Sequence, residues 1–152
     1  MQDGLALEQT RIAQRYQADT DKQRGDRDGV VVTPVEIVDF QVRAVMDSLA
    51  QQGLSLTNPQ VRLIDPFGGT GIYAARLMQL CGLEPGEIDD LYHERMWVNE
   101  IDQEAANIAD GNLRTVFQQV TGRPARKSVV TCLDTFTLKE GYWPWEDDTN
   151  HN

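Results

Sequence analysis

The 152-residue sequence has few cysteines, few histidines and little positive charge. Cys81 and Cys132 stand far apart without Cys-x-x-Cys spacing, so neither a disulfide framework nor a metal site is indicated, and we expect both to be buried. His93 is expected on the surface of an acidic connection. Because 14 cationic residues face 24 acidic ones, the cationic surface that nucleic-acid binding needs is not evident. Contact with DNA would require a local basic patch or another polypeptide.

Long apolar runs are also missing, so neither a signal peptide nor a membrane span is predicted, and we expect a cytoplasmic protein without membrane contact. The length and the 40% content of hydrophobic residues predict one compact core. We divide the chain into an N-terminal helix with a charged linker (1–29), a main region (30–138) and a C-terminal tail (139–152).

Strand and helix patterns alternate through the main region. Thr33, Pro34 and Glu36 match a capping box that begins a helix, with Gly53 as its stop. Further helices are expected after the first two strands, and 82–95 is an acidic connection with room for one short helix. The predicted strands are 61–65, 96–102 and 128–134. This order predicts an α/β fold with about three parallel strands and flanking helices.

A glycine-rich turn, within the stretch LIDPFGGTGIY, links the first predicted strand to a helix. Glycines let the backbone approach a ligand closely and aim the first free N–H groups of the helix at it. The spacing from Gly69 also satisfies the dinucleotide pattern Gly-x-Gly-x-x-Ala. However, the carboxylate of Asp65, just before the turn, is unfavourable beside a pyrophosphate and suits a ligand that carries an ammonium group.

Each predicted strand ends at an acid, namely Asp65, Glu100 or Asp134. The carboxyl ends of parallel strands face the ligand crevice, where Glu100 suits the hydroxyls of a ribose. Asp134 could accept from an adenine amine, and Phe136 or Phe67 could lie against the base. This set suits S-adenosylmethionine better than an anionic dinucleotide. Each acid also has a plainer interpretation as a cap of the turn or helix that follows it.

The stretches VVVTPVEIVDF, LIDPFGGTGIY, WVNEID and CLDTF, in this order, resemble the cofactor half of gamma-type adenine-N6 DNA methyltransferases. The resemblance is strongest to the methyltransferase module of single-chain restriction-modification enzymes that also carry a helicase, and it covers Val30 to Leu138. It implies an incomplete Rossmann-like S-adenosylmethionine-dependent methyltransferase fold.

The resemblance also implies the parts of the cofactor that individual residues contact. Thr33 and Pro34 would border its methionine end, Asp65 and the glycine backbone its amino acid portion, Glu100 its ribose and Asp134 its adenine. The full set of implied cofactor-binding residues is Thr33, Pro34, Asp65, Pro66, Phe67, Gly69, Gly71, Glu100, Asp134 and Phe136.

One part of the family pattern is missing. The Asn-Pro-Pro-Tyr-like tetrapeptide, which binds the flipped adenine, is not found after Asp134, nor is a fourth strand. We therefore predict no catalytic residue, and we expect the chain alone to bind cofactor weakly and not to methylate. DNA would be reached only through a missing domain or a partner chain.

The family sheet order, 3-2-1-4, would leave the first strand at an unpaired edge. We expect this edge to associate with a second polypeptide, with copies of the chain or with the remainder of a longer enzyme. Two other functions stay open: a non-catalytic or split methyltransferase-like module that acts through a protein partner, and a nicotinamide-dependent oxidoreductase. The pairs Asp65-Pro66 and Thr33-Pro34 argue against the oxidoreductase.

Overall fold

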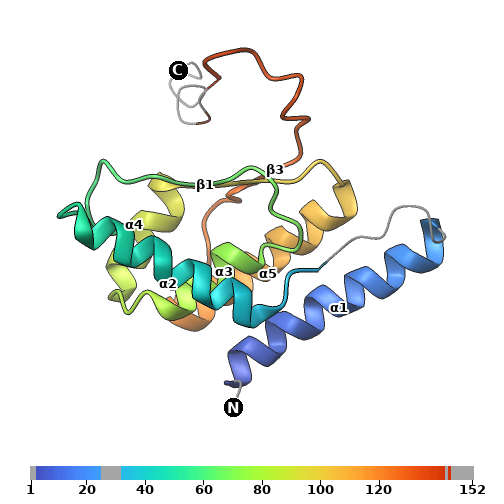
Figure 1. The fold of residues 1–152 in the computed structure, drawn as a ribbon, viewed down its shortest axis with the longest axis horizontal. Helices are drawn as coiled ribbons and strands as arrows, with labels where there is room; N and C mark the ends of the chain where they lie inside the picture. Colours follow the sequence, from blue (N-terminus) through green and yellow to red (C-terminus); the bar gives the residue numbers. More distant parts are fainter. Residues whose placement is uncertain (1–2, 25–31, 143, 145–152) are drawn as a thin grey trace.

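The structure is a computed structural model that describes residues 3–24, 32–142 and 144. Its elements in chain order are α1 (Gly4–Arg24), α2 (Val35–Gln51), β1 (Leu63–Asp65), α3 (Ile72–Leu80), α4 (Pro85–Arg95), β2 (Met96–Asn99), α5 (Gln103–Thr121) and β3 (Val130–Thr131). Figure 1 shows the strands nearly edge-on, with the helices mainly below them and residues 132–142 above.

The three strands form one parallel sheet in the order β1-β2-β3. The α/β fold is thus confirmed as an incomplete Rossmann-like arrangement of three parallel strands flanked by helices. The strands are shorter than predicted, because pairing stops at Asn99 in β2 and at Thr131 in β3. Within the described residues β1 pairs only with β2, which confirms the prediction that the first strand lies at an edge.

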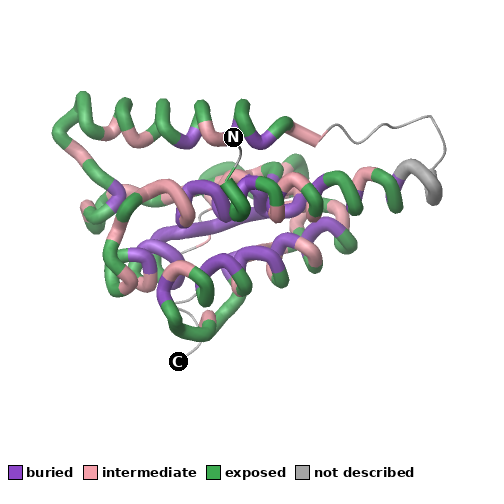
Figure 2. The backbone as a smooth tube through the Cα atoms, turned by 90° about the horizontal axis from the view of Figure 1, so that it is seen from below, coloured by how far each residue is buried: buried purple, intermediate pink, exposed green. Residues whose placement is uncertain are grey.

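The core lies between the sheet and the helices, and Figure 2 shows buried segments along the inward sides of those helices. All four residues of β2 are buried. Leu91 of α4 and Leu113 of α5 are fully buried, and the Tyr92 and Phe117 rings pack with their centroids 4.7 Å apart. The apolar stripes of these helices therefore cover the central strand.

Helix α2 is confirmed, but its predicted cap is wrong. Pro34, not Thr33, occupies the N-cap position, with φ of -56° and ψ of 140°, and its side chain makes no capping hydrogen bond. The Pro34 carbonyl accepts hydrogen bonds from the N–H groups of Ile37 and Val38, at 3.0 and 3.2 Å. The extended ψ of the proline thus moves the helix start one residue later. Val30 and Val31 lie outside the described residues.

The acidic connection contains a complete helix, α4, which begins with a capping box between Glu84 and Glu87. The expectation that His93 lies on the surface is wrong, because this side chain is only 3% exposed. Its Nδ1 lies 3.0 Å from Asp89 Oδ1, and its Nε2 accepts from the Arg126 N–H at 3.0 Å. His93 therefore joins α4 to the segment before β3.

The prediction for the cysteines holds only in part. Cys81 is half-buried at the end of α3, whereas Cys132 is exposed beyond β3. Strand β3 ends at Thr131, so the chain leaves the core before Cys132. Most of the predicted C-terminal tail lies outside the described residues. Among the helices that the structure describes, none is long and apolar enough to cross a membrane.

Candidate functional site

The glycine turn is pressed against the carboxyl end of β2. The Gly68 N–H donates to the Asn99 carbonyl at 2.7 Å, and the Gly71 N–H donates to the Gly68 carbonyl at 2.8 Å. A Cβ atom on Gly68 would lie 2.3 Å from Val98 Cγ1, which is far too close for any side chain. Only glycine therefore allows this approach of the turn to the central strand.

The two glycines named in the sequence prediction have different surroundings. Gly71, with φ of 80°, lies against α5, where a Cβ atom would be 3.1 Å from Leu113 Cγ. Gly69, with φ of 54°, has open space on the side where a Cβ atom would be. Its N–H donates to Glu100 Oε2 at 2.8 Å, so the structure brings these two predicted site residues together.

Asp65 is the least satisfied acid of the predicted site. Its Oδ1 accepts from the Phe67 N–H at 3.2 Å, while Oδ2 is buried and receives no hydrogen bond from any residue that the structure describes. Burial raises the pKa of the Asp65 carboxyl group above its ordinary value; the Phe67 N–H opposes this shift and Glu100 adds to it. A buried carboxylate oxygen without a donor costs free energy. This oxygen is therefore an acceptor at the turn whose hydrogen-bonding capacity the described residues leave unused.

Glu100 and Asp134 both act as caps through one oxygen. Glu100 Oε1 accepts from the Asp102 N–H at 2.9 Å, and Asp134 Oδ1 accepts from the Phe136 N–H at 3.0 Å. The interpretation of these acids as caps of the turn or helix that follows is therefore correct for these two oxygen atoms. It leaves a ligand role open, because a carboxylate has about four acceptor sites.

Asn99, at the end of β2, is a site-forming residue that sequence reasoning missed. Its Oδ1 accepts from Thr131 Oγ1 at 2.7 Å and from the Leu133 N–H at 3.0 Å, and its Nδ2 donates to the Leu133 carbonyl at 2.8 Å. These bonds hold the segment before Asp134 at the end of the central strand. Its position in the sequence could have indicated this role, because Asn99 is the polar residue that ends the stretch MWVN.

The remaining predicted residues differ in exposure. Phe67 is 69% exposed and Phe136 is 89% exposed, so both are accessible, and Pro66 is half-buried. Thr33 and Pro34 line a pocket of about 310 Å³ together with Ile72, which directly follows the turn.

The structure does not bring every predicted residue together. Within the described part of the chain, no hydrogen bond links Asp134 or Phe136 to Asp65, Gly69 or Glu100. Among the predicted site residues, Gly69 and Glu100 are thus linked at the turn, whereas Asp134 and Phe136 are hydrogen-bonded to each other.

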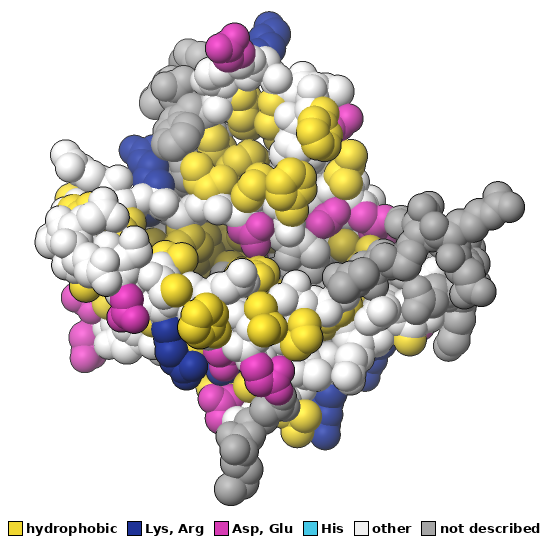
Figure 3. Space-filling model, in the orientation of Figure 1, with side chains coloured by type: hydrophobic (Ala, Val, Ile, Leu, Met, Phe, Trp, Pro, Cys, Tyr) yellow, Lys and Arg dark blue, Asp and Glu magenta, His cyan; other side chains and the backbone are white. Residues whose placement is uncertain are grey.

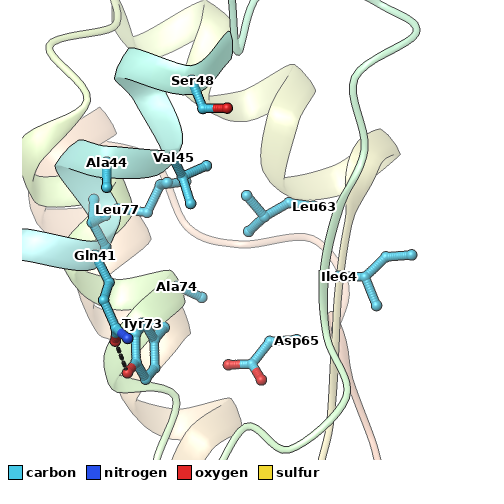
Figure 4. Close-up of a pocket in the computed structure, with 11 residues that line it drawn as sticks. Gln41, Ala44, Val45, Ser48, Leu63, Ile64, Asp65, Tyr73, Ala74 and Leu77 are labelled. Carbon is cyan, nitrogen blue, oxygen red and sulfur yellow. Dashed lines mark hydrogen bonds between the residues drawn. The ribbon is translucent and has the colours of Figure 1, made fainter. Parts of the chain in front are cut away.

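A larger hollow of about 630 Å³ adjoins the free edge of β1, between this strand, α2 and α3. Figure 3 shows hydrophobic side chains gathered around a hollow on this face. In Figure 4, Leu63 and Asp65 point into the hollow, toward α2 and α3, whereas Ile64 points away. At its margin the Tyr73 hydroxyl donates to Gln41 Oε1. Asp65 therefore lies where the hollow meets the glycine turn. The residues lining the hollow are Gln41, Val42, Ala44, Val45, Ser48, Leu63, Ile64, Asp65, Tyr73, Ala74 and Leu77.

No family model and no curated protein sequence matches the chain. Solved structures do. In a complex of DrdV with DNA, the similar part is 25% identical with a TM-score of 0.74, and it covers 84% of this chain and 13% of that one. For the ATP-dependent Type ISP restriction-modification enzyme LlaBIII bound to DNA, the identity is 28%, the TM-score 0.72 and the coverage 89% and 10%.

A nuclease-deletion mutant of the Type ISP restriction-modification enzyme LlaGI, in complex with a DNA substrate mimic, is 27% identical with a TM-score of 0.69. The match covers 89% of this chain and 12% of that one. The chain thus spans between 10% and 13% of the three longer chains. Its fold is similar to one module of Type ISP restriction-modification enzymes.

Proposed function

We propose that this chain is the S-adenosylmethionine-binding part of a DNA adenine-N6 methyltransferase in a restriction-modification type system. The observation that carries the proposal is the buried, unpaired Asp65 Oδ2 beside a glycine turn with an open side at Gly69. The likeness to Type ISP enzymes supports the restriction-modification context. The sequence resemblance to adenine-N6 methyltransferases supports the reaction.

The described residues fit the cofactor. Asp65 would accept from the ammonium group of its amino acid portion, and the open side of Gly69 leaves room for that portion. Glu100 would accept from the ribose hydroxyls and Asp134 from the adenine amine, with Phe136 against the ring. When bound, the cofactor supplies a methyl group activated by the sulfonium; this chain binds and orients it. Thr33, Pro34, Pro66 and Phe67 would border the bound molecule.

The same geometry disfavours a nicotinamide-dependent oxidoreductase. The pyrophosphate of a dinucleotide would face the Asp65 carboxylate, which lies directly beside the turn N–H groups that would have to bind it. One of those N–H groups, that of Gly69, already donates to Glu100. A cationic ligand end therefore fits this turn better than an anionic one.

Isothermal titration calorimetry with S-adenosylmethionine tests the assignment. We expect Asp65→Ala and Asp65→Asn to weaken binding by about 1–3 kcal/mol, because each removes a charged acceptor. Asp110→Asn is the matched control, since the Asp110 carboxylate pairs with Arg114 on α5 and has no hydrogen bond to the described residues of the turn. Titration with a nicotinamide dinucleotide provides the second arm. Failure of the wild-type chain to bind S-adenosylmethionine, or equal binding by the Asp65 variants, would contradict the proposal.

We further propose that β1 accepts an additional parallel strand from the remainder of such an enzyme. The free edge adjoins the apolar hollow, and Ile64 is 40% exposed beside it. Exposed backbone groups on an apolar edge strand favour pairing with another strand. The share of 10% to 13% that the chain covers in its longer structural neighbours supports a covalently linked occupant.

Light scattering tests this edge. Without its partner strand, the chain should self-associate as its concentration rises, and Ile64→Lys should reduce that association. Ile101→Lys serves as the control, because Ile101 is 63% exposed but follows the central strand. A monodisperse wild-type monomer at high concentration would count against the proposal.

A further inference from the structure

Helix α1 docks through small and polar side chains instead of a wide apolar stripe. The buried residues recur at helical spacing and are Ala6, Gln9, Ala13, Tyr16 and Thr20. Gln9 is only 1% exposed. Because a buried amide is costly without hydrogen-bond partners, the surroundings of Gln9 must supply both a donor and an acceptor.

Those partners lie on α5 and lead directly to the glycine turn. Gln9 Nε2 donates to Asn112 Oδ1 at 2.8 Å, and Asn112 Nδ2 donates back to Gln9 Oε1 at 2.8 Å. Asn112 Nδ2 also donates to the Thr70 carbonyl at 2.9 Å. Thr70 is buried between Gly69 and Gly71. Residues more than a hundred positions apart thus form one buried chain of hydrogen bonds.

The chemistry of the chain fixes the orientation of the Asn112 amide. A carbonyl can only accept, so Asn112 must present its NH2 group to Thr70. The reciprocal pair by itself would form equally well with both amides turned over. The bond to Thr70 selects one of these two arrangements. Gln9 matches it, because its Nε2 donates to Asn112 Oδ1 and its Oε1 accepts from Asn112 Nδ2. Gln9 therefore holds the Asn112 donor against the turn.

The turn needs this support because its glycines have great conformational freedom. On the side of β2 it is held by the bonds of Gly68 and Gly69. On the side of α5, Leu113 packs against Gly71 and Asn112 supplies the hydrogen bond. The Thr70 carbonyl belongs to the peptide that carries the Gly71 N–H, so the Asn112 bond orients that whole peptide plane.

We propose that Gln9 of α1 is a positioning residue for the cofactor turn and acts on the Thr70 carbonyl through Asn112. This inference rests on the proposed function for its effect on cofactor affinity. Its effect on the turn does not depend on the cofactor. It assigns α1 a part in completing the site, although α1 supplies none of the predicted cofactor contacts.

The test compares Gln9→Leu with Thr20→Val, a nearly isosteric change on the same buried face of α1. We expect Gln9→Leu to bind S-adenosylmethionine about tenfold more weakly, the equivalent of one good hydrogen bond. We also expect faster amide hydrogen exchange at Gly69 and Gly71. Thr20→Val should change neither quantity. The double variant Gln9→Leu/Asn112→Leu should be no worse than Asn112→Leu, because the two residues act in series.

Each result decides the inference. Should Gln9→Leu fail to fold, Gln9→Met carries the test, since methionine adapts to irregular space. Exchange rates and affinity equal to those of Thr20→Val would show that Gln9 only packs α1, and would overturn the proposal. Failure of the wild-type chain to bind S-adenosylmethionine would instead contradict the proposed function. Hydrogen exchange at the turn would then decide the role of Gln9 by itself.

Discussion

The two ends of the sheet each hold an ionisable side chain with buried polar atoms, and the two side chains differ in how fully those atoms are hydrogen-bonded. At the amino end of the strands, Arg95 is 4% exposed, and its Nε and Nη2 both donate to the Asp90 carboxylate. Its Nη1 donates to three backbone carbonyls, those of Leu56, Asn58 and Val61, at 2.8 to 2.9 Å. Arg95 thereby fastens the segment that leads into β1.

At the carboxyl end, Asp65 has one backbone donor and a buried oxygen without a partner. A fold can satisfy a buried charge completely, as it does for Arg95. Among the described residues, Gln79 Nε2 and the Tyr92 hydroxyl are also buried without a partner, but Asp65 is the only carboxylate in this state. Sites that break such a rule are commonly functional. The Arg95 contacts at the amino end of the sheet serve stability, whereas the unsatisfied Asp65 oxygen at the carboxyl end supports the proposed ligand role.

The largest expected effect concerns Arg95. Arg95→Leu should lower the free energy of unfolding by about 3–5 kcal/mol, because it leaves three backbone carbonyls, those of Leu56, Asn58 and Val61, without their charged donor. Urea denaturation followed by circular dichroism measures the loss. Arg114→Leu is the control and should cost less than about 1 kcal/mol, since its ion pair with Asp110 is partly exposed. Equal losses in the two variants would refute the structural role of the amino end.

Gly68→Ala tests how closely the turn must approach β2. The new methyl group would overlap Val98, so we expect a loss of about 1–3 kcal/mol in unfolding free energy. Gly111→Ala, in α5, is the matched control, because a Cβ atom there has open space. It should stabilise the chain by about 0.5–1 kcal/mol. A neutral Gly68→Ala variant would mean that the turn can move away from the strand.

The smallest stability effect is expected at Asp65 and depends on pH. Its pKa is raised in the folded chain above the ordinary value of 3.8, so folding favours the protonated form. The carboxyl group therefore lowers stability as pH rises from 3.8 through the folded-state pKa. Asp65→Asn should remove this pH dependence and stabilise the chain at pH 7, relative to wild type, by less than about 1 kcal/mol.

Denaturation of both proteins at pH 7 and near pH 3 measures this difference. A variant that is less stable than wild type at pH 7 but not near pH 3 would show that the ionised carboxylate stabilises the fold. That result would remove the contrast with Arg95.

The local sequence was sufficient to predict a helix where capping residues mark both its start and its end. Helix α5 begins after Asp102, whose side chain accepts from the Ala105 N–H, and ends at Gly122, with φ of 72°. Both markers were visible in the sequence. The predicted cap at Thr33 was wrong because the extended Pro34 displaced the helix start. The predicted exposure of His93 was wrong because its partner, Arg126, lies 33 residues away in the sequence. The candidate site shows the same difference between local and distant features. The glycine turn and the acids beside it were predicted from local sequence, but Asn99 was not.

The sequence by itself determined the order of strands and helices, the ends of α5 and the placement of an acid before a glycine turn. These features depend on backbone preferences and apolar periodicity, which act over a few residues. Only the tertiary structure decided that Asp65 Oδ2 is left without a donor, that Asn99 holds the segment before Asp134, and that Gln9 reaches Thr70 through Asn112. Hydrogen bonds between distant segments depend on side-chain placement in the packed chain, and no local pattern encodes that placement.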